Sequence, residues 1–261
     1  MKSPNTPKRA RLALALAAAL ACSFAWPAQD VAPKSTRKSA AVTPKLEPNE
    51  TALEPLESTY ELSRGVITLG EATFTLNPDE SGRCWVYRYR ASPTGIARLF
   101  IGDITETSHF CIVDGFIRSQ KFSFHRADKK KDNFNLEFNW DDHVVRSSVG
   151  DMRPLKNHMI DRLAMQVAVK RWVVARGGKP GPEIIALTKV EDDRVKTYSF
   201  QIVGREEVET PAGTFDAVRV DRVDDPKKST RFWLAPERNY KVVKVEQVRK
   251  GSEQLKMLLT E

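Results

Sequence analysis

Residues that build common catalytic and metal centres are scarce in this chain of 261 residues, which has only three cysteines and four histidines. No two of the histidines have the spacing of a zinc motif such as HExxH, so we expect no metal and no cofactor. The glycine-rich loops of nucleotide-binding proteins and the GxSxG turn of serine hydrolases are also missing. These absences exclude the common enzyme classes that depend on such motifs.

Long apolar runs are scarce as well, and the one that stands out lies near the N-terminus. A basic segment over residues 2–11 is followed by an apolar run over residues 12–26 and by Pro27. The run has about fifteen residues, whereas a helix that spans a bilayer needs roughly twenty, so the pattern is that of a secretory signal. We expect residues 1–25 to be a signal peptide, and the alternative is a lipoprotein anchored through Cys22. No later run is long enough to span a membrane, so no transmembrane segment is expected in the mature chain.

Basic charge is not concentrated in the body of the chain. The formal net charge is +8, but Lys2, Lys8, Arg9 and Arg11 precede the apolar run, which leaves 8 − 4 = +4 for the rest. In segments such as KVEDDRVK the bases alternate with acids. Nucleic-acid-binding proteins instead carry a continuous basic stripe or patch, so we expect no nucleic-acid partner.

Aromatic residues are missing from residues 29–57, which are rich in proline, alanine, lysine and glutamate. Such a segment cannot bury enough apolar surface to offset the entropy of ordering it. We predict a disordered tail over residues 26–58 and a single β-rich domain over residues 59–261. An extended arm that lies on the domain is the alternative for the tail.

The rest of the chain is dominated by apolar and polar residues that alternate with a period of two. The clearest case is residues 133–140, where large apolar side chains occupy every second position. Each such segment has one apolar and one polar face, which is typical of strands in antiparallel sheets. The apolar residues of the predicted strands are Trp85, Tyr87 and Tyr89; Phe110 and Ile112; Phe122 and Phe124; Phe134, Leu136, Phe138 and Trp140; Tyr198, Phe200 and Ile202; Val218 and Val220; Val243 and Val245; and Leu255, Met257 and Leu259.

The exception is residues 156–178, where apolar residues recur at helical spacing. We expect Asn157 to cap the N-terminus of this helix, and Gly177 and Gly178 to end it. The helix divides the strands into two sets. The predicted fold class is mainly β (α+β), with a strongly curved antiparallel sheet or open half-barrel wrapped around one long helix. A two-layer α+β sandwich is the alternative.

Two of the cysteines lie in neighbouring predicted strands. Cys84 and Cys111 each alternate with bulky apolar residues, so both thiols point away from the apolar face. If the two segments pair as an antiparallel hairpin, Cys84 lies opposite Cys111 and Trp85 lies opposite Phe110. In an oxidising compartment we expect a disulfide between the two cysteines, with two free thiols as the alternative.

The connection between these two strands, residues 91–103, is short and apolar. We predict a short helical cap near residues 93–101, in which Ile96, Leu99 and Phe100 fold over the open end of the sheet and shield its apolar face. A lip that docks a partner or gates a ligand is the alternative.

Five segments of the chain resemble a known family. They are, in order, YELSRGVITLGEATFTL (60–76), YRYRASPTGIARLF (87–100), NHMIDRLAMQVAV (157–169), KTYSFQIVGREEVETPAGTFDAVRVDRV (196–223) and RFWLAPERNYKVVKVEQ (231–247). On these motifs the chain is similar to the domain-of-unknown-function family 3108, found in envelope proteins of Gram-negative bacteria. The resemblance covers nearly all of residues 59–259 and implies a secreted, mainly β domain with no assigned reaction, cofactor or catalytic set. With the signal peptide removed, we expect the chain in the periplasm. The cysteine pair is not part of the family pattern.

Three hypotheses for function follow. The first is a non-enzymatic carrier or sensor of an apolar or amphipathic, lipid-like envelope molecule, with the apolar interior of the sheet as its pocket; exported half-barrel carriers work this way, an analogy of fold alone. The second is an envelope protein that binds or assembles protein partners. The third is a hydrolase without a recognisable motif; Asp141, Asp142 and His143 could form an acid/base group, although adjacent acids after a strand are also typical of a turn. The predicted ligand-binding residues are Trp85, Tyr87, Tyr89, Ile96, Leu99, Phe100, Phe138 and Trp140.

Overall fold

The computed structural model describes residues 53–150 and 152–261. The chain divides into two units, Met1–Thr36 and Arg37–Glu261, and the described residues all belong to the second. The predicted signal peptide, Cys22 and most of the predicted tail lie outside the described residues. The last three residues assigned to the tail, 56–58, lie in the first strand, because they continue its alternation and pair with residues 74–76.

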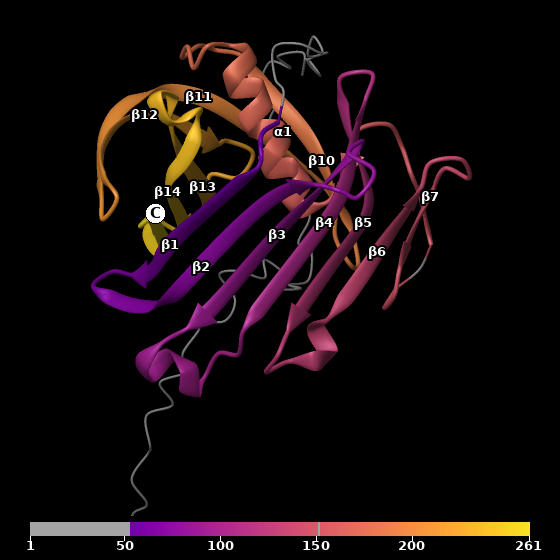
Figure 1. Ribbon diagram of the computed structural model, residues 1–261, viewed down its shortest axis with the longest axis horizontal. Coiled ribbons are helices and arrows are strands. Elements are labelled where there is room, and N and C mark those ends of the chain that lie inside the picture. Colours follow the sequence, from indigo (N-terminus) through magenta and orange to yellow (C-terminus); the bar gives the residue numbers. More distant parts are fainter. Residues whose placement is uncertain (1–52, 151) are drawn as a thin grey trace, which may run out of the picture. The chain divides into compact units, whose positions relative to one another are not determined.

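One sheet of 15 strands makes up most of the described chain (Figure 1). Its strands are β1 Leu56–Arg64, β2 Ile67–Pro78, β3 Cys84–Pro93, β4 Ile104–Val113, β5 Phe116–Arg126, β6 Phe134–Asn139, β7 Val144–Ser147, β8 Arg153–Pro154, β9 Met159–Ile160, β10 Ile184–Val190, β11 Val195–Thr210, β12 Gly213–Arg222, β13 Lys228–Ala235, β14 Lys241–Arg249 and β15 Ser252–Leu259. The helices are α1 Arg162–Ala175 and three short 3-10 helices, η1 Gly95–Leu99, η2 Lys130–Asp132 and η3 Pro236–Arg238. The prediction of a mainly β domain is confirmed, and α1 is the one α-helix of the described part.

The sheet consists of two meanders that meet where β15 pairs with β1. The first meander, β1–β8, crosses the sheet in chain order; β9 and α1 follow, and the second meander, β10–β15, returns in chain order to β1. Neighbouring strands are antiparallel except β9 and β10, which are parallel. The prediction of a purely antiparallel sheet is therefore wrong at that edge. The sheet does not close into a barrel, since β8 and β9 are its two outermost strands.

Helix α1 begins later than the sequence predicted. Its N-cap is Asp161, whose carboxylate accepts hydrogen bonds from the backbone N–H groups of Leu163 and Ala164. Asn157 does not cap the helix, because residues 159–160 pair with β10 and keep the residues before them out of the helix.

The helix ends where the sequence predicted. Gly177 and Gly178 follow the C-cap with positive φ angles of 61° and 65°, a conformation that glycine adopts without strain. A Cβ atom at Gly178 would also lie 2.7 Å from a methyl group of Val218. This position therefore needs glycine both for its backbone angle and for the close approach of β12.

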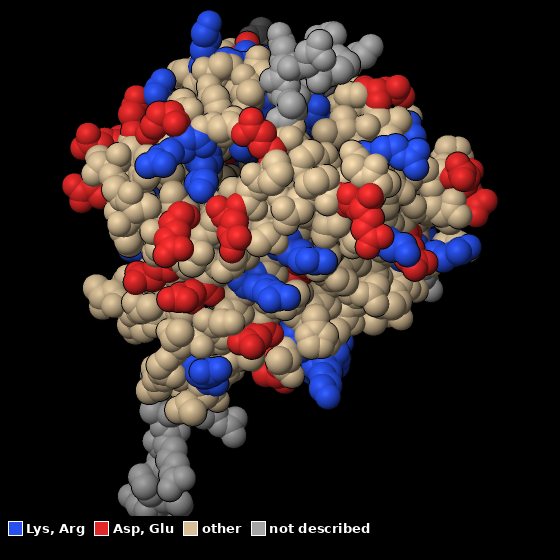
Figure 2. Space-filling view, viewed as in Figure 1, with Lys and Arg blue, Asp and Glu red and all other residues tan. Residues whose placement is uncertain are grey.

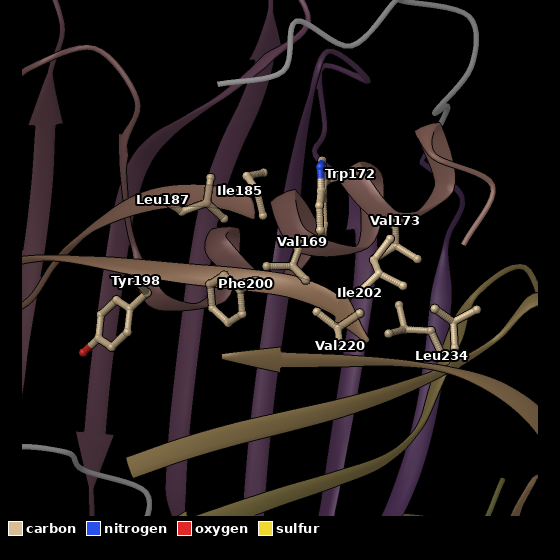
Figure 3. Packing of buried hydrophobic residues seen from close by; sticks show 11 residues of the cluster. Val169, Trp172, Val173, Ile185, Leu187, Tyr198, Phe200, Ile202, Val220 and Leu234 are labelled. Carbon is tan, nitrogen blue, oxygen red and sulfur yellow. The ribbon is translucent and has the colours of Figure 1, made fainter. Parts of the chain in front are cut away.

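Helix α1 packs against the second meander through a cluster of buried apolar side chains (Figure 3). The helix contributes Val169, Trp172 and Val173, and the strands contribute Ile185, Leu187, Tyr198, Phe200, Ile202, Val218, Val220 and Leu234. The helix also contacts β3, β4 and β5 of the first meander. It is therefore held between the two meanders, which share it as their common core element.

The β3–β4 hairpin has the register predicted from the sequence. Cys84 lies opposite Cys111 and Trp85 lies opposite Phe110. The two cysteines form a disulfide, with their Cα atoms 4.2 Å apart. A disulfide of this kind fits an oxidising compartment.

The segment after β3 is helical, but it does not shield the sheet. Ile96 and Leu99 are 71% and 77% exposed, Phe100 is 59% exposed, and Ala97 is the only buried residue of η1. The predicted shielding by these three side chains is therefore wrong. The physical reason is the helix type: with three residues per turn, Ile96 and Leu99 project from the same side of η1, and that side faces solvent.

Candidate functional site

The predicted ligand-binding residues do not come together in one place. Tyr87, Tyr89 and Phe138 are buried, Trp85 and Trp140 are half-buried, and the three side chains of the η1 segment are exposed. Within this set, Trp85, Tyr87 and Tyr89 alternate along β3, so they share one face of the sheet. We therefore consider the buried face of the first meander and the exposed η1 region separately.

A row of aromatic residues crosses the buried face of the first meander. Phe74, Tyr89, Glu106 and Phe124 lie opposite one another on β2, β3, β4 and β5. The rings of Phe74 and Tyr89 have centroids 4.7 Å apart. The row is interrupted by the carboxylate of Glu106, which is 3% exposed.

Glu106 is paired with the first residue of the helix. The guanidinium of Arg162 lies 2.9 Å from a Glu106 oxygen and covers the ring of Phe124 at 5.0 Å. Burial raises the pKa of Glu106 above its ordinary value, although Arg162 and Lys189 act in the opposite direction. The buried hydroxyl of Tyr89 next to it has no hydrogen-bond partner among the described residues.

Asp161 is the centre of a second set of buried contacts. Besides the two backbone N–H groups that it caps, its carboxylate accepts hydrogen bonds from the hydroxyls of Ser108 and Ser119 at 2.7 and 2.6 Å. Its own backbone N–H donates to Ser119 Oγ at 2.9 Å. Burial raises the pKa of Asp161, while these hydrogen bonds lower it. A carboxylate has about four acceptor positions, and all of them are used here.

We call Glu106, Ser108, Ser119, Asp161 and Arg162 the helix-start cluster. It fixes the first turn of α1 to β4 and β5, and it leaves no acceptor of Asp161 for a substrate. The sequence analysis missed these residues, yet a signal was present: Glu106 and Ser108 occupy the inward positions of β4 between Ile104 and Phe110. Polar residues on the otherwise apolar face of a strand indicate a hydrogen-bond or ion-pair partner inside the protein.

A further charged group lies at the β10–β11 turn, which β8 contacts. Lys189 Nζ and Arg194 Nε each lie 2.6 Å from the carboxylate of Glu191. Burial alone would raise the pKa of Glu191, but the two cations hold it below its ordinary value. Arg153 of β8 donates to the backbone carbonyls of Glu191 and Asp192, in the turn between β10 and β11. One side chain thus links β8, an outermost strand, to the turn after β10, the strand that pairs with the other outermost strand, β9.

The residues considered for acid/base chemistry occupy a turn. Asp141, Asp142 and His143 are exposed in the connection between β6 and β7, where the side chain of Asn139 accepts hydrogen bonds from the backbone N–H groups of both acids. Within the described ranges, no three histidine, cysteine or acidic side chains group in a way that could hold a metal ion.

Exposed apolar side chains gather beside η1. Residues 67–69 extend β2 past the last pair of the β2–β3 ladder, Gly70 and Pro93. The backbone N–H of Thr94 donates to the Leu69 carbonyl at 3.0 Å, so the η1 segment lies next to the β1–β2 turn. We call the exposed side chains of these two segments the apolar rim: Val66 (102% exposed), Ile67 (57%), Ile96 (71%), Leu99 (77%) and Phe100 (59%).

A basic loop lies against the same segment. Residues 127–132, which we call the lysine loop, include the exposed Lys129, Lys130 and Lys131. The backbone N–H of Ala127 donates to the Asp103 carbonyl at 3.0 Å, and a Cβ atom at Gly102 would lie only 2.6 Å from the backbone nitrogen of Asp128. Figure 2 shows mainly uncharged surface where Figure 1 places η1, at the lower end of β3 and β4.

No helix in residues 53–150 and 152–261 combines the length and the hydrophobicity that crossing a bilayer requires.

Two solved structures are similar to this domain. One is the β-barrel-like protein of the domain-of-unknown-function family DUF1849 from Brucella abortus, with a TM-score of 0.50 and 14% sequence identity over 78% of this chain and 95% of that one. The other is a protein from Bacteroides fragilis described as exported, with a YmcC-like fold, a TM-score of 0.38 and 16% identity over 78% of this chain and 93% of that one. At such low identity, the likeness to the first concerns the fold alone.

No curated protein matches the sequence. The model of the protein family of unknown function DUF3108, however, matches residues 59–260. This span includes the helix-start cluster, the apolar rim and nearly all strands of the sheet. The chain therefore belongs to the DUF3108 family.

Proposed function

We propose that this protein is an exported, non-enzymatic binding protein of the cell envelope that engages an amphipathic, lipid-like molecule through its apolar rim. The observation that carries the proposal is the gathering of five large apolar side chains, each more than half exposed, at one end of neighbouring strands. Single exposed apolar residues are ordinary on protein surfaces, whereas contiguous ones mark binding sites. The curved, half-barrel-like sheet supplies the rigid support for them.

The buried charged groups favour binding over catalysis. A catalytic acid or base must be within reach of substrate, whereas Asp161 has every acceptor position engaged and Glu106 is paired with Arg162 inside the protein. The acids that are exposed at the β6–β7 turn have no histidine or hydroxyl bound to them among the described contacts.

Export supports the same proposal. The Cys84–Cys111 disulfide fits the periplasm, which the chain reaches once the signal peptide of residues 1–25 is removed. The alternative form, a lipoprotein anchored through Cys22, would hold the same rim close to a membrane. The intact mass of the mature chain distinguishes a free N-terminus after Ala25 from a lipidated Cys22.

The test is binding of a monomeric amphiphile to the exported chain. Lysophosphatidylcholine below its micelle concentration is titrated against wild type and against the double variant Ile96→Ser, Leu99→Ser, with tryptophan fluorescence as the signal. We expect the double variant to bind at least tenfold more weakly, because it removes the two most exposed side chains of η1. Native mass spectrometry of wild type purified from the periplasm should show a bound lipid-like mass.

The control is Val203→Ser, which changes an exposed apolar residue of β11 (42% exposed) away from the rim. It should bind as wild type does. Equal affinity of the rim variant and wild type, or no binding of any amphiphile, would overturn the proposal. In that case crosslinking of the rim to an envelope protein would support an interaction or assembly factor instead.

A further inference from the structure

We infer that the apolar rim and the lysine loop together dock the domain, end-on, on the surface of an anionic phospholipid bilayer. The inference rests on the proposed function, because the rim is the amphipathic-binding surface in both. It goes further in naming the partner as a charged membrane surface rather than a single dissolved molecule.

The topology of the first meander places the required residues at one end. Successive antiparallel strands reverse direction, so the β1–β2, β3–β4 and β5–β6 connections all lie at the same end of the sheet. These connections carry the apolar rim and the lysine loop. With neighbouring strands about 4.8 Å apart, the row from β1 to β6 is roughly 24 Å long, which is a surface rather than a pocket.

The next connection at this end extends the row. Val149 and Met152, which lie between β7 and β8, are 57% and 58% exposed. Seven of the ten exposed large apolar side chains of the described residues therefore lie at this end of the first meander. Side chains of this size insert into the boundary between lipid headgroups and acyl chains.

The charges at this end are complementary to anionic headgroups. Arg98, Lys129, Lys130 and Lys131 are exposed beside the rim. The carboxylate of Asp128 is taken up by Arg126 at 2.8 Å, which leaves Asp103 and Asp132 as the acids of these two connections. With Asp151, which the sequence places in the β7–β8 connection, four cations against three acids give an excess of 4 − 3 = +1. Lysines next to apolar anchors are the typical device for binding anionic leaflets.

The opposite end of the same strands has the opposite character. Its connections are residues 79–83, 114–115 and 140–143. They carry the acids Asp79, Glu80, Asp114, Asp141 and Asp142 and none of the exposed large apolar residues. An anionic bilayer would repel this end and attract the other, so the charge distribution also sets the orientation of docking.

The second meander limits the docking surface. At the end corresponding to the rim, its three connections carry acids and bases together, and Asp224 is taken up by Arg222 at 2.7 Å. The charged residues there are Asp192, Asp193, Arg194, Asp225, Lys227 and Lys250. This mixture gives no basic excess, so we place the contact on β1–β8, where most of the exposed large apolar side chains lie.

Flotation with vesicles tests the inference. The exported chain, whose intact mass shows that it carries no lipid, is mixed with phosphatidylcholine vesicles or with mixed phosphatidylcholine/phosphatidylglycerol vesicles. We expect it to float with the anionic vesicles only and to be released by added salt, because exposed charges are screened by ions.

The triple variant Lys129→Gln, Lys130→Gln, Lys131→Gln separates charge from apolar contact. It should lose tenfold or more of its affinity for the anionic vesicles and keep the wild-type affinity for monomeric lysophosphatidylcholine. The matched control Lys121→Gln, Lys156→Gln, Lys179→Gln removes three exposed lysines that lie outside this end and should float as wild type does.

The outcomes separate the two proposals. Three results would overturn the bilayer inference: equal flotation with both vesicle types, no flotation at all, or an equal loss of vesicle affinity in both triple variants. The proposed function stands in each case if the rim variant still loses lysophosphatidylcholine binding. If neither vesicles nor monomeric amphiphile bind, both proposals fail. Val149→Ser with Met152→Ser gives a further check on the bilayer alone, since it should weaken flotation without changing monomer binding.

Discussion

The helix-start cluster and the apolar rim differ in where they place side chains of each polarity. In the cluster, polar groups lie inside the protein and are satisfied: Asp161 accepts four hydrogen bonds, and Glu106 is paired with Arg162. In the rim, apolar groups lie outside and contact solvent. Buried polar groups with complete partners serve the fold. Exposed apolar groups contribute little to the fold, which is why we propose a binding role for the rim.

The comparison predicts that substitutions in the cluster change stability and leave binding unchanged, whereas substitutions in the rim do the reverse. The largest effect on stability should come from Asp161→Ala. This change uncaps α1 and leaves the hydroxyls of Ser108 and Ser119 without their acceptor. We expect a loss of about 4 kcal/mol in the free energy of unfolding, measured by urea denaturation. The folded fraction should still bind amphiphile as wild type does.

Asp141→Ala is the control, because its carboxylate lies in an exposed turn. It should change the free energy of unfolding by no more than about 0.5 kcal/mol. A similarly small effect of Asp161→Ala would show that the cluster is not what holds the helix to the sheet.

An intermediate effect is expected from pH. The pKa of Glu106 is raised in the folded protein. Between the unfolded and the folded pKa, the folded state therefore keeps a proton that the unfolded state has released. Stability from this group is therefore complete below the unfolded pKa, which is near 4.3, and is lost as pH rises through the folded pKa. Wild type should lose more stability over this range than Glu106→Gln, by about 1.4 kcal/mol for each unit by which the pKa is raised.

Urea denaturation at a series of pH values, with both proteins measured side by side, checks this expectation. Identical pH profiles would mean that Glu106 is ionised in the folded protein as readily as in the unfolded chain. Binding of amphiphile should be the same in both proteins at each pH, which again separates the cluster from the rim.

The smallest effect on stability should come from the rim itself. The double variant Ile96→Ser, Leu99→Ser removes side chains that are more than two-thirds exposed, so the free energy of unfolding should change by no more than about 0.5 kcal/mol. Thermal or urea unfolding of the variant used in the binding test provides the measurement. A loss of several kcal/mol would indicate that these side chains are covered in solution. The rim would then not be the exposed apolar surface on which the proposed function depends.

Local patterns in the sequence were sufficient for much of the fold. In β3 and β4 the alternation of bulky residues with Cys84 and Cys111 fixes which face each side chain occupies, and a one-residue slip would bury the wrong set. The pairing of these strands could therefore be predicted residue by residue. The mainly β class, the position of the helix between two groups of strands and its glycine terminus followed in the same way.

What could not be predicted depends on contacts between distant segments. Asn157 and Asp161 are both good N-cap residues, and the choice between them is made by residues 159–160, which pair with a strand some thirty positions later. The exposure of Ile96, Leu99 and Phe100 was missed for a related reason: alternation shows which residues share a face, but it does not show whether anything covers residues in a connection. The position of the lysine loop beside η1 likewise follows only from the paired strands.

Arg153 has a consequence for how this protein opens. Along the sheet each strand is tied to the next by backbone hydrogen bonds, but β8 is joined to the β10–β11 turn by a guanidinium that donates to two carbonyls. Parting such a seam breaks far fewer bonds than parting a ladder, so the least costly fluctuation separates β8 from the β10–β11 turn. Amide hydrogens of β7 should thus exchange with solvent well before those of β3 and β4, while the helix-start cluster keeps β4 and β5 attached to the start of α1.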